Sequence, residues 1–156
     1  MAMDLGDLLA ADGIVPSLKA KNKKQVLQEL AERAATVTGL AAREIYDTLL
    51  QRERLGSTGF GRGIAIPHVK LRNIKKIMCV FARLAEPVDF DAHDGEPVDL
   101  VFVLLAPEHA SGDHLKALAR ISRIVRDPVM LERLRKAGGQ SELRAFLTSP
   151  ATSHAA

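Results

Sequence analysis

The chain has 156 residues, of which 47% are hydrophobic and 26% charged, with a formal net charge of +3. This length suits one domain that buries its own core without disulfides or structural metals, and the composition excludes an intrinsically disordered chain. Tryptophan is absent, and the lysines and arginines are spread along the whole sequence. Both features argue against a nucleic-acid-binding surface, which needs stacking aromatic residues or a clustered basic stripe.

The single cysteine and the apolar segments bear on the compartment. Cys79 lies within the apolar run IMCVF, and a lone cysteine cannot form a disulfide within the chain. The opening MAMDLGDLLAADG lacks the basic start and long apolar stretch of a secretory signal. The longest apolar run, residues 100–106, is too short to span a bilayer. We therefore predict a cytoplasmic protein with no membrane insertion.

Short elements and two helices are expected in the first third of the chain. Residues 4–9 predict a short opening helix, and residues 14–18, which contain Pro16, predict a short edge strand. A longer helix follows Asn22, the expected N-cap, and ends at Gly39. Its predicted inner face comprises Val26, Leu27, Leu30, Ala34 and Val37.

The next helix is predicted over residues 41–54. Its inward positions are Ile45, Leu49 and Leu50. Arg52 and Arg54 stand near its C-terminus, where cations complement the helix dipole.

Beyond residue 76 the pattern predicts strands and then helices. Residues 77–84 are β-rich, and residues 98–106 (VDLVFVLLA) form a continuous apolar run, typical of a strand covered on both faces. The intervening DAHDGEP has turn composition. Three helices are then expected, over residues 113–126, 128–136 and 141–147. On the first of these, the predicted core-facing residues are Leu115, Leu118, Ala119, Ser122 and Val125.

Strands buried on both faces require helices on both sides of the sheet. The sequence therefore predicts an α/β fold, a three-layer sandwich with a mixed β-sheet and helices on both faces. We expect one domain over residues 1–148, followed by a flexible C-terminal tail at residues 149–156.

The most unusual stretch is GSTGFGRGIAIPH, residues 56–68, with four glycines in eight positions. A P-loop would end in Gly-Lys-Ser/Thr and enter a helix, and a dinucleotide fingerprint would follow a strand; this stretch does neither. It predicts a glycine loop feeding a short strand that starts with residues 64–66 and ends at His68. Pro67 fixes its own φ and favours an extended Ile66, so the direction of His68 is set. Glycines in such a loop allow tight turns or the close approach of another molecule.

A second histidine, His114, stands in the first turn of a predicted helix that Ser111 or Asp113 would cap. The exposed amides and positive dipole end at this place favour an anion such as phosphate, and they favour a neutral imidazole. A neutral ring nitrogen is a nucleophile or a proton acceptor. A surface histidine with no chemical role is the alternative interpretation.

The run RERLGSTGFGRGIAIPH, from Arg52 to His68, and the later PVDLVFVLLAPEHASGDHLKAL resemble one known family. The family is the enzyme IIA domain of the mannitol/fructose type (type 2) of the bacterial phosphotransferase system, and the resemblance is strongest to its nitrogen-regulatory branch. It extends over roughly residues 5–147. Val69 departs from the pattern, because the family usually has glycine after the histidine.

The resemblance implies a phosphotransferase component in which His68 is the phosphorylated nucleophile and His114 helps to position the phosphoryl group. It implies that Arg52 stabilises the phosphate, for which a planar guanidinium is suited. The loop residues expected to meet the phosphate or a partner are Gly56, Ser57, Thr58, Gly59, Gly61 and Gly63. The donor would be a histidine-containing phosphocarrier protein, itself charged from phosphoenolpyruvate through enzyme I, and no cofactor or metal is implied.

Two readings of this chemistry stay open. As a nitrogen-type regulatory phosphocarrier, the protein would regulate unknown target proteins through the phosphorylation state of His68. The absence of an attached membrane domain in the sequence and the GSTG form of the motif favour this reading. As a sugar-specific enzyme IIA, it would pass the phosphoryl group to the IIB domain of a fructose or mannitol permease.

Two further readings come from other classes. A metal hydrolase would use His68, His93, His109 and His114 with Asp89, Asp91 or Asp94, but no HxH or HxxxH spacing supports it. A binding module would use His68 for structure only. His93, His109 and, in the tail, His154 receive no role.

Overall fold

The structure, a computed structural model, describes residues 5–109 and 112–148. Its elements in chain order are β1 (Leu9–Leu18), α1 (Lys23–Thr38), α2 (Ala42–Leu55), β2 (Gly59–Gly61), β3 (Ile64–Ala65), β4 (His68–Leu71), β5 (Met78–Val88), β6 (Val98–Pro107), α3 (Asp113–Val125), α4 (Pro128–Lys136) and α5 (Gln140–Leu147). The predicted tail at residues 149–156 lies outside the described residues.

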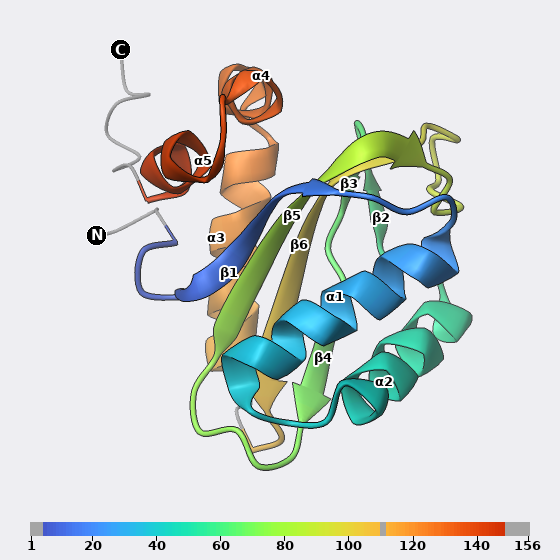
Figure 1. Ribbon diagram of the computed structural model, residues 1–156, viewed down its shortest axis with the longest axis vertical. Helices are drawn as coiled ribbons and strands as arrows, with labels where there is room; N and C mark the ends of the chain where they lie inside the picture. Colours follow the sequence, from blue (N-terminus) through green and yellow to red (C-terminus); the bar gives the residue numbers. More distant parts are fainter. Residues whose placement is uncertain (1–4, 110–111, 149–156) are drawn as a thin grey trace.

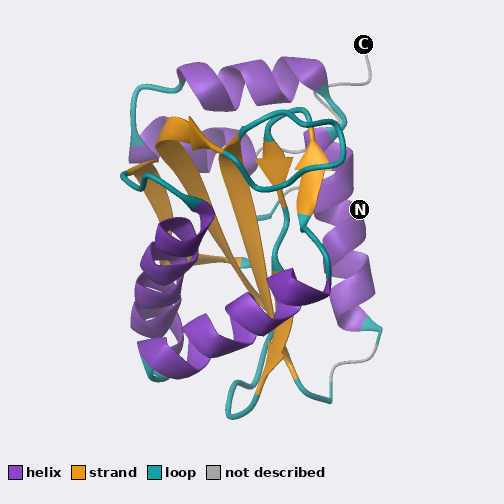
Figure 2. Ribbon diagram, turned by 90° about the vertical axis from the view of Figure 1, so that its right-hand side faces the viewer, coloured by secondary structure: helices purple, strands orange, loops and turns teal. Residues whose placement is uncertain are grey.

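One mixed sheet forms the middle layer. Its strand order is β1-β5-β6-β3-β2, with β4 also pairing with β6. Helices α1 and α2 pack on one face, and α3, α4 and α5 pack on the other (Figure 1). The turned view in Figure 2 likewise shows helices on both sides of the strands. The three-layer α/β sandwich expected from the sequence is therefore confirmed.

The strand β6 is the centre of the molecule. Every residue of it except Asp99 is buried, and it pairs antiparallel with β5 and parallel with β3 and β4. Its side chains alternate between two cores. Val101, Val103 and Leu105 contact α1 and α2, whereas Leu100, Phe102 and Leu104 contact α3 to α5.

Local signals set the first helices as predicted. The side chain of Asn22 accepts a hydrogen bond from the backbone N–H of Gln25 at 2.9 Å, and Gly39 ends α1 in the left-handed conformation with φ of 80°. In α2, Ile45 and Leu49 are fully buried. Leu50 is only partly buried.

Two predictions about elements outside the histidine motif were wrong. Residues 5–8 form no helix: residues 6–8 make a turn, and β1 begins at Leu9. The amide of Cys79 donates to the carbonyl of Leu8, so pairing with β5 outweighs the local helical tendency. The face of α3 was also misassigned in part, because Val125 is buried as predicted but Ala117 and Ile121 are the other buried residues, whereas Leu115 is 60% exposed.

The segment before His68 is an interrupted strand rather than one strand ending at the histidine. β3 and β4 lie one after the other along β6, pairing Ala65 with Val101 and His68 with Leu104. The break falls at Ile66 and Pro67, and proline has no N–H for the ladder. His68 therefore begins β4. The side chain of Val69 packs into the core of α1 and α2, away from His68 on the alternating strand.

Candidate functional site

The side chain of His68 lies half-buried in an open groove of about 630 Å³. The groove runs between the loop that follows α2 and the outer face of α3. Its lining residues are Arg52, Ser57, Thr58, Gly59, Phe60, Ile66, His68, His93, Leu115, Leu118, Ala119, Ser122, Arg123 and Arg126. This described lining includes three arginines and no carboxylate, so the groove suits an anionic group.

One ring nitrogen of His68 is fixed by the backbone. Nδ1 lies 2.9 Å from the carbonyl oxygen of Ile66. A carbonyl only accepts hydrogen bonds, so Nδ1 carries the proton, and the neutral ring then has an unprotonated Nε2 with a free lone pair. The geometry therefore selects Nε2 as the nucleophilic nitrogen.

His114 lies beside His68. Their ring centroids are 6.4 Å apart and the ring planes are inclined by 28°. His114 is the second residue of α3, whose N-cap is Gly112, and no side-chain cap hydrogen bond is present there. Asp113 is thus inside the helix rather than its cap, and Ser111 lies outside the described residues. The Nδ1 atom of His114 is buried without a hydrogen-bond partner among the described residues.

Arg52 lies in the last turn of α2 and lines the groove with His68. Its Nη1 donates to the carbonyl of Gly56 at 2.9 Å, which holds the start of the glycine loop. A guanidinium carries five N–H donors, so this bond leaves donors for an anion.

Polar groups of the glycine loop form hydrogen bonds within the protein. The amide of Thr58 donates to Glu53, the amide of Gly59 donates to the hydroxyl of Ser57 at 3.0 Å, and the hydroxyl of Ser57 donates to the carbonyl of Phe90 at 2.5 Å. These amides have internal partners, so the positive potential of the groove comes chiefly from its arginines.

Several glycines answer internal packing demands. A Cβ on Gly59 would lie 2.7 Å from the Cβ of Ala92. Gly63 has φ of 83°, and a Cβ there would lie 2.5 Å from Nη2 of Arg135. Gly61 ends β2 with φ of 106°, and only Gly56 of this set faces open space. Ser57, Thr58 and Gly59 line the groove, whereas Gly56, Gly61 and Gly63 do not.

Some groove residues were missed by sequence reasoning. Arg123 and Arg126 are on the groove face of α3, together with Ala119 and Ser122. The helical spacing of Leu115, Leu118, Ala119 and Ser122 was a usable signal, but we predicted that these residues face the core. His93, which received no role, also lines the groove, whereas His109 is exposed and does not. His154 lies outside the described residues.

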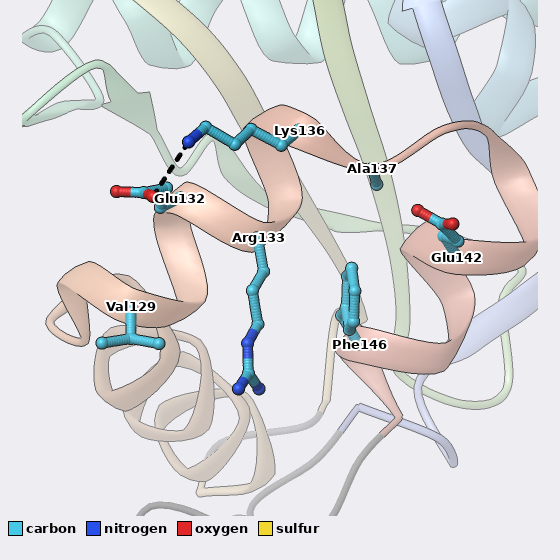
Figure 3. Close-up of a pocket in the computed structure, with 7 residues that line it drawn as sticks. All are labelled: Val129, Glu132, Arg133, Lys136, Ala137, Glu142 and Phe146. Carbon is cyan, nitrogen blue, oxygen red and sulfur yellow. Dashed lines mark hydrogen bonds and ion pairs between the residues drawn. The ribbon is translucent and has the colours of Figure 1, made fainter.

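We also searched the described residues for a metal site, another hollow and a membrane-spanning helix. Within residues 5–109 and 112–148, no three His, Cys, Asp or Glu side chains are grouped to hold a metal ion. A smaller hollow of about 350 Å³ between α4 and α5 shares no residue with the groove (Figure 3). Its Glu132 and Lys136 form an ion pair at 3.0 Å, and Arg133 stacks near Phe146. No helix of the described ranges is both long and apolar enough to cross a bilayer.

The fold and the arginine-rich histidine groove together mark a phosphotransferase component of the α/β class. Comparison with known proteins makes this assignment specific. The family model described as "Phosphoenolpyruvate-dependent sugar phosphotransferase system, EIIA 2" matches residues 7–149, so the chain belongs to this enzyme IIA family.

Individual relatives agree with the family. The chain is 51% identical over 148 residues to a "Nitrogen regulatory protein" of Bradyrhizobium diazoefficiens, covering 95% of this chain and 97% of the relative. The crystal structure of Nitrogen Regulatory Protein IIA-Ntr from Neisseria meningitidis is 37% identical, with a TM-score of 0.87 over 92% of this chain and 99% of that one. The crystal structure of IIA mannitol from Escherichia coli, at 24% identity and a TM-score of 0.74 over 88% of this chain and 97% of that one, supports the fold alone.

Proposed function

We propose that this protein is a regulatory phosphocarrier of the nitrogen-type phosphotransferase system that accepts a phosphoryl group on His68. The observation that carries this proposal is the hydrogen bond between Nδ1 of His68 and the carbonyl of Ile66, which leaves Nε2 free in a groove lined by three arginines. The donor that fits is a histidine-containing phosphocarrier protein, because the family belongs to a phosphoenolpyruvate-dependent relay.

The transfer needs little from the protein beyond positioning and charge. The lone pair of Nε2 attacks the phosphorus in line with the donor's N–P bond. That bond breaks, and its electron pair returns to the donor's ring nitrogen. The proton on Nδ1 stays in its bond to Ile66, so the acceptor ring releases no proton in this step.

Arg52 and His114 fit supporting roles in this step. A guanidinium from Arg52 offers donors to the equatorial oxygens, where negative charge is concentrated. His114 is a neighbour of His68, and an imidazole N–H suits a phosphoryl oxygen. Among the loop residues, we expect Ser57, Thr58 and Gly59 to meet the incoming group or partner, because they line the groove.

The regulatory role rests on the relatives named as nitrogen regulatory proteins, including the one 51% identical over 148 residues. A phosphoryl group adds a charge near −2 to the groove, which is enough to form or break a protein interface. Fructose-specific enzyme IIA relatives also match, at 40% identity over 101 residues for that of Haloferax volcanii. Transfer to a permease IIB domain is thus the second candidate. We also propose that residues 1–148 form one domain acting in the cytoplasm.

The test is intact-mass spectrometry after incubation with phosphoenolpyruvate, enzyme I and the phosphocarrier protein. We expect an acid-labile gain of one phosphoryl group that is lost in His68→Ala and slowed, but not abolished, in His114→Ala and Arg52→Ala. If the wild type gains no mass while a control enzyme IIA in the same tube is phosphorylated, the protein is a binding module and not a phosphocarrier. Rapid transfer from the phosphoprotein to a fructose or mannitol IIB domain would favour the sugar-specific role.

A further inference from the structure

A buried carboxylate lies beneath the glycine loop and has no place in the transfer chemistry. Glu53 follows Arg52 in α2 and is only 8% exposed. Its Oε2 pairs with Nζ of Lys23, from the start of α1, at 2.6 Å. The same Nζ donates to the carbonyl of Phe90 at 3.3 Å. Burying a carboxylate costs free energy of desolvation, which its partners must offset. We therefore looked for a function of this arrangement.

Glu53 binds both donors of one loop residue. The backbone N–H of Thr58 lies 3.2 Å from Oε1 and 3.3 Å from Oε2, and the Thr58 hydroxyl also donates to Oε1. Thr58 is itself 7% exposed. The carboxylate therefore fixes the position of the Thr58 residue from two directions, and hydrogen bonds to an ionised acceptor are the strong ones.

The chain of bonds continues from Thr58 to His68. The carbonyl of Thr58 accepts the N–H of Ile66 at 2.9 Å. The carbonyl of Ile66 in turn accepts from Nδ1 of His68 at 2.9 Å. Ile66 is available for these bonds because the strand is interrupted there, between β3 and β4, and it takes no register position on β6.

We propose that Glu53 is a positioning residue for phosphoryl transfer, acting through Thr58 and Ile66 to keep His68 in the Nδ1–H tautomer. Each bond fixes the backbone that makes the next one: Glu53 holds Thr58, the Thr58 carbonyl holds the N–H of Ile66, and the Ile66 carbonyl is thereby kept in place to accept from Nδ1 of His68. The tautomer matters because Nε2 is a nucleophile only while the proton is on Nδ1. This inference rests on the proposed function for its role in transfer, but its effect on the tautomer does not.

The test compares Glu53→Gln and Thr58→Val with the wild type in protein carrying ¹⁵N-labelled histidine. Glu53→Gln keeps the shape but removes the charge, and Thr58→Val removes only the hydroxyl. Glu44→Gln is the matched control, an exposed carboxylate on the same helix. Thr58→Ser, which keeps a hydroxyl, is the rescue variant. Long-range ¹H–¹⁵N correlations at pH 8.5, where an ordinary imidazole is neutral, report the tautomer of His68.

We expect the Nδ1–H tautomer alone in the wild type, Glu44→Gln and Thr58→Ser, and a mixture with the Nε2–H form in Glu53→Gln and Thr58→Val. The rate of phosphorylation by the phosphocarrier should fall roughly tenfold or more in those two variants, in keeping with the cost of a misplaced reacting group. Folded Glu53→Gln or Thr58→Val protein with the wild-type tautomer and rate would overturn the proposal. If Glu53→Gln does not fold, the tautomer and the phosphorylation rate of Thr58→Val test the proposal.

The two proposals fail separately. If the wild type takes no phosphoryl group, but Thr58→Val shows a mixture of tautomers where the wild type shows one, the proposed function is wrong and the positioning role of Glu53 stands. A wild type that is phosphorylated on His68, with variants that match it in tautomer and rate, would keep the function and remove the positioning role of Glu53.

Discussion

At the scale of single residues, the chemistry of His68 is set by the peptide group of Ile66. Pro67 has no N–H to join the ladder of β6, and the strand breaks there. The break leaves the N–H of Ile66 to Thr58 and its carbonyl to Nδ1 of His68. The proline thus lies where the strand breaks, and the carbonyl before it is the group that occupies Nδ1 of His68.

Asp94 gives a pH-dependent prediction for the loop that faces the β2–β3 hairpin. Its carboxylate accepts from the N–H of Arg62 at 2.9 Å and from that of Glu96 at 3.0 Å, and these bonds lower its pKa below 3.8. A depressed pKa means that the ionised form stabilises the fold at pH values above 3.8 and that this contribution is lost as the pH falls through the folded pKa. NMR titration should show the Arg62 amide shift changing with a midpoint below 3.8 and no such step in Asp94→Ala. A midpoint at or above the ordinary value would contradict this.

Cys79 gives the opposite prediction at high pH. Burial in the core raises the pKa of its thiol to about 12 from an ordinary 9.0. The folded protein then keeps the proton while the unfolded chain loses it, so stability falls as the pH rises from about 9 toward 12. At pH 8 a thiol reagent should label Cys79 only after unfolding in denaturant. Stoichiometric labelling of native protein at the rate of a free thiol would show that the site is open.

At the scale of elements, the β2–β3 hairpin owes its glycines to its own packing. The sequence offered two explanations for these glycines, tight turns or the close approach of another molecule. In the structure, Gly59 lies against Ala92, and Gly63 lies under the ion pair of Arg135 with Asp99. Only neighbours distant in the sequence reveal these contacts, so the local pattern could show that glycine was needed but not why.

Replacing Gly63 by alanine should therefore destabilise the protein. Its φ of 83° is strained for any L side chain, and the new Cβ would lie 2.5 Å from Nη2 of Arg135 and 2.8 Å from Oδ1 of Asp99. We expect a loss of about 1–3 kcal/mol in the free energy of unfolding by urea denaturation. Gly139→Ala is the control, because Gly139 has an extended φ of 175° and nothing lies within 4 Å of the added Cβ. Equal stabilities of the two variants would refute this account of Gly63.

At the scale of the whole molecule, the layers could be predicted because each rests on a local signal. The apolar run of β6, the Asn22 cap and the glycine end of α1 are visible in the sequence and appear in the structure. The predictions that were wrong depended on packing between distant segments. Leu9 belongs to β1 rather than to a helix because β1 pairs with β5. The buried face of α3 is the one that packs against the sheet.

The candidate site shows the same division. His68, Arg52 and the glycine loop could be identified from a contiguous motif, and the structure brings His68, Arg52 and residues 57–59 of that loop together in one groove. Arg123 and Arg126 reach that groove only because α3 packs across the sheet, and Glu53 gains its partners only when α1 and the loop meet α2. Which histidine nitrogen is free also depends on a tertiary hydrogen bond.

The two faces of α3 allow packing and docking to be separated. Ile121 is fully buried in the core, whereas Leu115 is 60% exposed on the rim of the groove. Ile121→Ala should cost about 2–5 kcal/mol of stability through the cavity it leaves. Leu115→Ala should change stability by less than about 0.5 kcal/mol but raise the KM for the phosphocarrier protein. Thermal melts and transfer kinetics measure the two effects, and an unchanged KM in Leu115→Ala would place the donor elsewhere.

The most direct test of the whole account is to locate the phosphoryl group on the phosphorylated protein. Histidine labelled with ¹⁵N and observed with ³¹P–¹⁵N coupling identifies both the residue and the ring nitrogen that bears the phosphorus. The account predicts coupling to Nε2 of His68, with the Nδ1 proton still bound to the carbonyl of Ile66. Coupling to Nδ1 of His68, or to His114 or His93, would contradict it.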